Sequence, residues 1–445
     1  MDLKPYYGFK GPNECILLAR DQPCSFHIDQ KELKGLAEVL FDFRFRPEIK
    51  FNIQCDLEVF HYYDSLTSKD VCITLNDRKI PVFATNIPIS GSPKITFVPK
   101  NEPISWIGDN NTKLSKVVFH LFNFNDTMGT SRPAIRKGDE VIFKAITEMS
   151  SIKWRVVFEN CDTSKTLDKL NKTGGYGLTH VSCFNQGDGT LFDGSTATQM
   201  LENLYLFFSF SKGSFCSPIL PVGFDENENI IWALLNHPRE TGTNPPFSWF
   251  DPHHCEQLAE LFPHFITKLE DENWRDTLNK VIYWYARSNN VSASGIDTGI
   301  ILTQIAIERL SFEYAVNHKK MIEANGFKDL KASDKFRLLF ASLDIPTDIP
   351  SNLSEIKAIA SRFGYIDAPY FLTEVRNSMV HPEHKREDDF SDIYYDAWRL
   401  GLWYLELAIL RLCNYNGTYF NRLSDELWVG KVEKVPWVKE VKTDN

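Results

Sequence analysis

The sequence predicts an α+β protein, in which a β-rich N-terminal part precedes an all-helical C-terminal part. Short runs of β-branched and aromatic residues, separated by turn-forming residues, fill roughly the first 190 positions. From position 272 onward, apolar residues instead recur every three or four positions, which is the period of an α-helix. We therefore divide the chain into β-rich residues 1–190, a mixed α/β connector 191–271 and an all-α region 272–445.

The β-rich part contains several clear strand patterns with partial alternation of apolar and polar residues. Turn-forming stretches at 108–111 and 136–139 separate them. This spacing favours a sandwich-like antiparallel arrangement, or a curved antiparallel sheet, over βαβ units. The expected strands cover residues 95–98, 116–122, 140–146 and 153–158.

The connector is predicted to mix both kinds of element. Residues 197–210 read as one helix and residues 230–235 as a strand, and residues 241–246 form the clearest loop. Helical character returns at about residue 253.

The C-terminal part is predicted to be a succession of helices over 274–287, 297–317, 333–343, 352–363, 369–380 and 392–413. Asn352 and Glu355 have the spacing of a capping box, and Pro369 lies near the first turn of its helix, where a missing N–H costs little. The last helix carries two apolar stripes, so it needs two partners, and a second copy of the protein is a candidate for one of them. The stripes are Trp398, Leu402, Leu405, Ile409 and Leu412, and Leu400, Trp403, Leu407 and Leu410.

Composition limits the class of protein. Hydrophobic residues make up 43% and charged residues 24%, which is ordinary for a soluble globular protein. The net charge of −10 argues against a surface coated in basic residues for nonspecific nucleic-acid binding. The nine cysteines include no C-x-x-C pair, so we expect reduced thiols in a cytoplasmic protein without a metal or cofactor. The N-terminus lacks a signal-peptide pattern, and no apolar run is long enough to span a membrane.

The most informative motif is Arg376-Asn377-Ser378-Met379-Val380-His381, followed by Pro382. In an unbroken helix Arg376 and His381 would point about 140° apart. Because the residue before proline is pushed out of the α region, His381 is expected to leave the helix, and its ring can then turn back towards Arg376. Arginine can hold phosphate oxygens in a bidentate fork, and histidine can move protons near neutral pH.

These residues resemble the motif of the HEPN domain family, an arginine, often followed by asparagine, and a histidine four to six residues further on. The resemblance covers roughly residues 275–420, and it includes residues 301–310, which are similar to the helix preceding the motif. A β-rich part followed by such a domain also resembles the architecture of ApeA-type anti-phage proteins.

The resemblance implies an endoribonuclease that needs no metal and acts in anti-phage defence, abortive infection or as a toxin. It implies that Arg376 binds the scissile phosphate, that His381 is the general base or acid, and that Asn377 orients them. Glu308 is a weaker candidate for positioning Arg376. RNA would be the substrate, and two copies would form a shared cleft in a homodimer. A phage-derived or nucleotide trigger would act through the β-rich part.

Two alternatives stay open. His384 and Lys385 could extend a positive rim for RNA, but residues 387–389 are acidic, so a solvated loop explains them equally well. The helical region could also be a non-catalytic interaction module, because many HEPN domains are inactive scaffolds.

Overall fold

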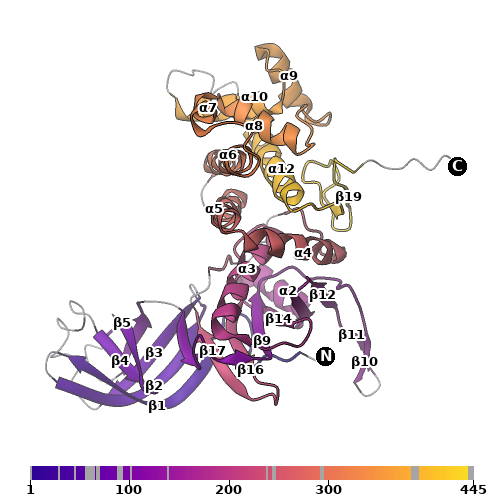
Figure 1. The fold of residues 1–445 in the computed structure, drawn as a ribbon. Helices are drawn as coiled ribbons and strands as arrows, with labels where there is room; N and C mark the ends of the chain where they lie inside the picture. The colour runs from indigo at the N-terminus through magenta and orange to yellow at the C-terminus, as the bar shows by residue number, and fades with distance from the viewer. Residues whose placement is uncertain are drawn as a thin grey trace. The chain divides into compact units, whose positions relative to one another are not determined.

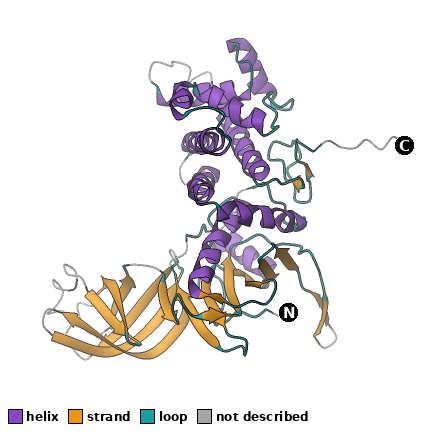
Figure 2. Ribbon diagram, viewed as in Figure 1, coloured by secondary structure: helices purple, strands orange, loops and turns teal. Residues whose placement is uncertain are grey.

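The computed structural model describes residues 3–28, 31–44, 47–55, 66, 71–87, 94–100, 103–137, 140–236, 239–242, 247–290, 295–381 and 390–438. It divides into two compact units, each built from separate stretches of chain. The first unit is Met1–Asp126, Val156–Leu201 and Cys216–Asn244, and the second is Thr127–Arg155, Glu202–Phe215 and Pro245–Asn445. Strands predominate in the first unit and helices in the second (Figure 2). The predicted combination of a β-rich N-terminal part and helical C-terminal part is therefore confirmed.

Within the described residues, six antiparallel strands of the first unit close into a barrel. The long strand β1 closes it, because Phe26 lies opposite Leu33 on one neighbouring strand and opposite Ile73 on the other. Alternate side chains fill the interior and leave His27 outside. This closed barrel replaces the sandwich that the strand spacing favoured. Around the barrel the order is β1 (Ile16–Ile28), β2 (Lys31–Asp42), β3 (Glu48–Cys55), β6 (Lys94–Pro99), β5 (Arg78–Asn86) and β4 (Val71–Leu75).

A seven-stranded sheet follows the barrel (Figure 1). Its central strand β9 is buried along its whole length after Lys116, since it lies between β14 and β16. The order is β12 (Ile146–Ser150), β13 (Trp154–Asn160), β14 (Leu178–Gln186), β9 (Lys116–Phe122), β16 (Ile219–Phe224), β17 (Ile230–Leu235) and β7 (Ile104–Ile107). The accompanying elements are α2 (Thr163–Thr173), α3 (Gly194–Lys212) and the strand pairs β8 (Lys113–Leu114) with β15 (Phe192–Asp193) and β10 (Ala134–Lys137) with β11 (Glu140–Phe143).

Two histidines of this sheet are completely buried. His120 accepts the backbone N–H of Tyr6 at Nε2 (3.3 Å), and its Nδ1 lies 3.0 Å from the carbonyl of Ile219. Burial lowers the pKa of His120 to about 4, although the backbone hydrogen bonds oppose the shift. His180 lies against the edges of Phe124 and Phe158, and burial lowers its pKa to about 3. Both rings are therefore neutral parts of the core at neutral pH.

The second unit contains the helices that the sequence predicts and one short helix, over Ala324–Asp329, that it does not predict. The predicted helix over 297–317 ends in a π-helical turn. Within the described residues, no helix combines the length and apolar character needed to cross a membrane. The helices are α4 (Glu256–Glu270), α5 (Glu272–Asn289), α6 (Ile296–Phe312), η2 (Glu313–His318), α7 (Ala324–Asp329), α8 (Ala332–Ser342), α9 (Ser354–Phe363), α10 (Ala368–Val380), η3 (Ser391–Ile393) and α12 (Tyr394–Leu412), followed by the small pair β18 (Thr418–Tyr419) and β19 (Glu433–Lys434).

Helix α12 is buried on both of its apolar stripes by its own chain. It packs against α5, α6 and α10, and the segment after it also covers it, where Trp403 donates to Tyr419 Oη at 3.0 Å. On another side Tyr404 stacks on Phe340. The predicted need for two partners is therefore met within the chain, because the returning C-terminal segment supplies the second one, and neither stripe requires a second copy.

A buried ion pair joins α12 to this returning segment. Glu406 and Arg422 are 1% and 4% exposed, and Arg422 Nε donates to Glu406 Oε2 at 2.8 Å. Tyr285 donates to the same carboxylate, while Arg422 also donates to Asn289 and to the carbonyl of Phe247. Both charges are thus satisfied, which is the condition for keeping them inside a protein.

Candidate active site

Helix α10 carries the Arg376 motif, and its two ends are defined by local chemistry. At the start, the Asp367 carboxylate accepts the N–H of Tyr370 at 2.9 Å, and Pro369 occupies the first turn as expected. At the end, His381 has the extended conformation φ −118°, ψ 109°. The prediction that His381 leaves the helix before Pro382 is therefore confirmed. By contrast, Asn352 forms no capping box, because Leu353 is the N-cap of α9 and the Asn352 amide donates to the carbonyl of Leu423.

Asn377 connects the members of the motif. Its Oδ1 atom accepts from Arg376 Nη1 and its Nδ2 atom donates to Glu374 Oε1, both at 3.4 Å, close to the outer limit of a hydrogen bond. Its backbone carbonyl accepts the N–H of His381 at 3.0 Å. Arg376 and Asn377 are half-buried, whereas His381 is exposed. The weak side-chain contacts leave the guanidinium able to exchange its partner for a ligand oxygen.

The rest of α10 is held firmly against its neighbours. Phe371, Leu372 and Val375 are buried, and the helix packs against α6, α8 and α12. The buried Gln304 side chain of α6 donates to the carbonyl of Leu372 at 2.6 Å, one turn before Arg376. The motif therefore lies at the C-terminal end of a helix whose other face is fixed.

An ion pair fixes the beginning of α10. Arg337 of α8 donates to both oxygens of Asp367, at 2.5 and 3.0 Å, and it also contacts Asp334. Neither Arg337 nor Gln304 is distinguishable by pattern alone from other polar residues of these helices. Asp367 does carry a signal, since an aspartate two residues before proline is typical of a helix start.

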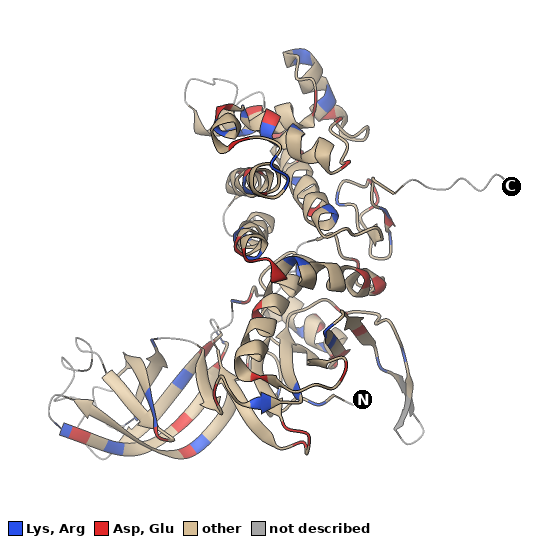
Figure 3. Cartoon of the chain, viewed as in Figure 1, with Lys and Arg blue, Asp and Glu red and all other residues tan. Residues whose placement is uncertain are grey.

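Of the remaining predicted site residues, the structure describes Glu308 alone. Glu308 accepts from Lys335 Nζ at 2.6 Å, so its carboxylate is committed to α8. His384 and Lys385 lie outside the described residues. Among the described residues there is no group of three His, Cys, Asp or Glu side chains that could hold a metal ion. Figure 3 shows basic and acidic positions interspersed along the helices.

Comparison with known proteins places the motif within a named region. Residues 109–245 match the YopA central domain and residues 271–434 match the YopA C-terminal domain, which contains all of α10. No solved structure matches the chain.

A curated relative extends this similarity along most of the sequence. The "SPbeta prophage-derived uncharacterized protein YopA" of Bacillus subtilis (strain 168) is 31% identical over 330 residues, which cover 73% of this chain and 73% of the relative. The chain therefore belongs to the YopA family.

Proposed function

We propose that this protein is a metal-independent endoribonuclease of the HEPN type, whose active site contains Arg376, Asn377 and His381. The observation that carries the proposal is the end of α10, where His381 leaves the helix immediately after the turn that holds Arg376 and Asn377. An exposed histidine at the same end of the helix as a weakly held guanidinium supports acid–base chemistry on a phosphodiester. In this proposal the helices from residue 272 onward form the HEPN-like bundle.

The reaction uses the ribose as its own nucleophile. The 2′-oxygen attacks the adjacent phosphorus, its proton passes to a base, and the bond from phosphorus to the 5′-oxygen breaks as that oxygen gains a proton. The products are a 2′,3′-cyclic phosphate and a 5′-hydroxyl. His381 serves as base or acid, Arg376 neutralises the charge that develops on the phosphoryl oxygens, and Asn377 orients the guanidinium.

A complete site requires two copies in this proposal. The motif offers one histidine per chain, while the reaction removes one proton and delivers another. A homodimer in which both motifs face one cleft supplies both groups. The burial of α12 within its own chain means that the dimer contact must lie elsewhere, and the C-terminal end of α10 is the place that the chemistry requires.

The biological role belongs to the same proposal. The Bacillus relative is described as prophage-derived, which fits a protein that acts in conflict between phages and their hosts. We place RNA cleavage in anti-phage defence, abortive infection or toxicity, with the β-rich unit sensing a phage-derived or nucleotide trigger.

The first test is cleavage of RNA by the purified full-length chain in EDTA. Wild type should generate 2′,3′-cyclic ends, and Arg376→Ala and His381→Ala should each lower the rate by about 10² or more. Arg20→Ala and His27→Ala, on the exposed side of barrel strand β1, are matched controls that should cleave like wild type. Equal cleavage by wild type and both motif variants would remove these residues from the reaction.

A non-catalytic interaction module is the second candidate, and one observation favours it. Asn377 already hydrogen-bonds both Arg376 and Glu374, and these bonds are sufficient to explain the motif as a purely structural closure of the helix end. In that case Arg376→Ala should lower the melting temperature or make the protein monomeric. The two functions separate because the ribonuclease proposal expects the folded dimer to persist in both motif variants.

A further inference from the structure

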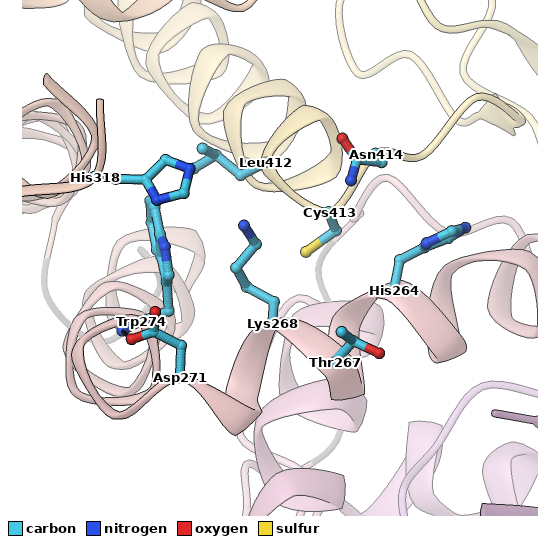
Figure 4. A pocket seen from close by; sticks show the side chains of 9 residues that line it. All are labelled: His264, Thr267, Lys268, Asp271, Trp274, His318, Leu412, Cys413 and Asn414. Carbon is cyan, nitrogen blue, oxygen red and sulfur yellow. Dashed lines mark hydrogen bonds between the residues drawn. The ribbon is translucent and has the colours of Figure 1, made fainter. Parts of the chain in front are cut away.

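A hollow of about 220 Å³ lies in the helical unit, apart from the α10 site (Figure 4). Four elements meet there, because α4 ends, α5 begins, the π-helical turn η2 ends and α12 ends around it. A π-helix is rare and is frequently found at functional sites. The lining residues are His264, Thr267, Lys268, Asp271, Trp274, His318, Leu412, Cys413 and Asn414.

The hollow has an apolar floor and nitrogen groups above it. Trp274, Leu412 and Cys413 are buried. The Lys268 ammonium lies 4.8 Å from the centre of the Trp274 ring, and the His318 ring meets the same indole edge-on at 5.6 Å. Figure 4 shows the Lys268 side chain extending into the space between His318 and Cys413. The indole therefore positions both groups without using their hydrogen bonds.

Some hydrogen-bonding groups that line the hollow already have partners within the protein, and others do not. Within the described part of the chain, Lys268 forms no ion pair, and neither the His318 ring nor the Asn414 side-chain amide forms a hydrogen bond. The Asp271 carboxylate, in contrast, already accepts the N–H groups of Asn273 and Trp274 at the start of α5. The hollow consequently offers uncommitted donors and a carboxylate that is already occupied.

The lowered pKa of His318 indicates that the neighbouring positive charges outweigh the negative ones. Burial lowers the pKa of His318, and the neighbouring Lys268 and Lys319 lower it further. Asp271 and Glu313 oppose this shift without reversing it. Glu313 is itself buried and accepts from Asn317 at 2.7 Å, so it is committed elsewhere.

We propose that this hollow binds a small phosphate-bearing anion, with Lys268 as the charged anchor and His318 and Asn414 as hydrogen-bonding partners. A lysine ammonium is a compact point charge that suits a phosphate group, and amide and imidazole groups complete the contacts without adding fixed charge. Free phosphate and the phosphate of an organic monoester present the same chemistry to these groups. This site is independent of the proposed ribonuclease chemistry.

The experiment is calorimetric titration of the full-length chain with inorganic phosphate and, separately, with glycerol phosphate. Sodium chloride at matched ionic strength shows the effect of screening alone. Saturable binding of either compound is expected. Lys268→Met should weaken the binding affinity by about tenfold or more, because it removes one charge-assisted hydrogen bond. Preferential binding of glycerol phosphate would assign the site to organic monoesters.

Two further variants make the result specific. His318→Phe keeps the edge contact with Trp274 but removes the ring nitrogens, so it should weaken binding while the melting temperature is maintained. Lys280→Met removes an exposed α5 lysine that pairs with Asp276 and does not line the hollow, so it should bind like wild type. The absence of saturable binding of both compounds to wild type, or unchanged binding by both Lys268→Met and His318→Phe, would overturn the proposal.

Discussion

The β-rich unit and the helical unit bury different kinds of polar group. The sheet of the first unit encloses the neutral imidazoles of His120 and His180, whose pKa values burial lowers to about 4 and about 3. The helical unit encloses an ionised pair, Glu406 with Arg422, and leaves His381 exposed at the end of α10. Residue type alone therefore does not identify a reactive group. Of these three histidines, only His381 is exposed enough to exchange protons with a substrate.

Disrupting the buried ion pair of the helical unit is expected to have the largest effect on stability. Arg422→Met should lower the free energy of unfolding by about 3–5 kcal/mol, because it leaves the Glu406 carboxylate buried without its countercharge. Urea unfolding followed by hydrogen exchange should locate the loss in the helical unit. The double variant Arg422→Met/Glu406→Leu should recover part of this stability, and a double variant as unstable as the single one would contradict the explanation.

Mild acid should act on the β-rich unit instead. The folded pKa values of His120 and His180 lie below the unfolded value of about 6.5. The stability is therefore complete above that pH and is lost progressively as the pH falls from there to the folded values. At pH 5 each histidine should cost about 2 kcal/mol of stability.

Hydrogen exchange of the two units at pH 7 and pH 5 measures this difference. His180→Phe places a phenyl ring beside Phe124 and Phe158. It should lower by one the number of protons taken up on acid unfolding. The exposed His27→Gln should leave it unchanged. Equal acid sensitivity of the two units would show that the buried imidazoles of the first unit do not control its acid stability.

Removing the hydrogen bond between Gln304 of α6 and the Leu372 carbonyl of α10 is expected to have a smaller effect on stability. Gln304→Leu removes the donor to the Leu372 carbonyl and should cost about 1–2 kcal/mol. If this bond positions the motif, RNA cleavage should fall more than the unfolding free energy alone explains. Comparing the cleavage rate with the melting temperature of the same variant checks this, and full activity would remove Gln304 from the site.

The smallest expected effect concerns the start of α10. Asp367→Asn keeps an N-cap side chain but weakens the ion pair with Arg337, so it should cost about 1 kcal/mol or less. Asp367→Ala removes both contacts and should cost more. Comparing the melting temperatures of the two variants separates the stability due to the N-cap hydrogen bond from the stability due to the ion pair with Arg337.

Local pattern was sufficient for most of the helical unit but insufficient for the barrel. Apolar periodicity predicted α12 almost to the residue, and Pro382 predicted the extended conformation of His381. The barrel depends on β1 pairing with both β2 and β4, and such distant pairing leaves no mark in a short window of sequence. The partner of Glu406 was hidden for the same reason, since Arg422 reaches it only after the chain turns back.

The site shows the same limit. The motif itself was visible as a run of sequence, whereas Gln304 and Arg337 act through contacts that require the packed helices. Glu308 has the expected position on α6 but pairs with Lys335, because the ends of long side chains are placed by their neighbours rather than by helical register.

The most direct test of the central claim is the yield of 2′,3′-cyclic phosphate ends when equal amounts of wild type and His381→Ala are incubated with RNA in EDTA. We expect cleavage by wild type and a rate lower by about 10² or more for the variant, with identical melting temperatures. Cyclic ends produced at the same rate by both proteins would contradict the claim.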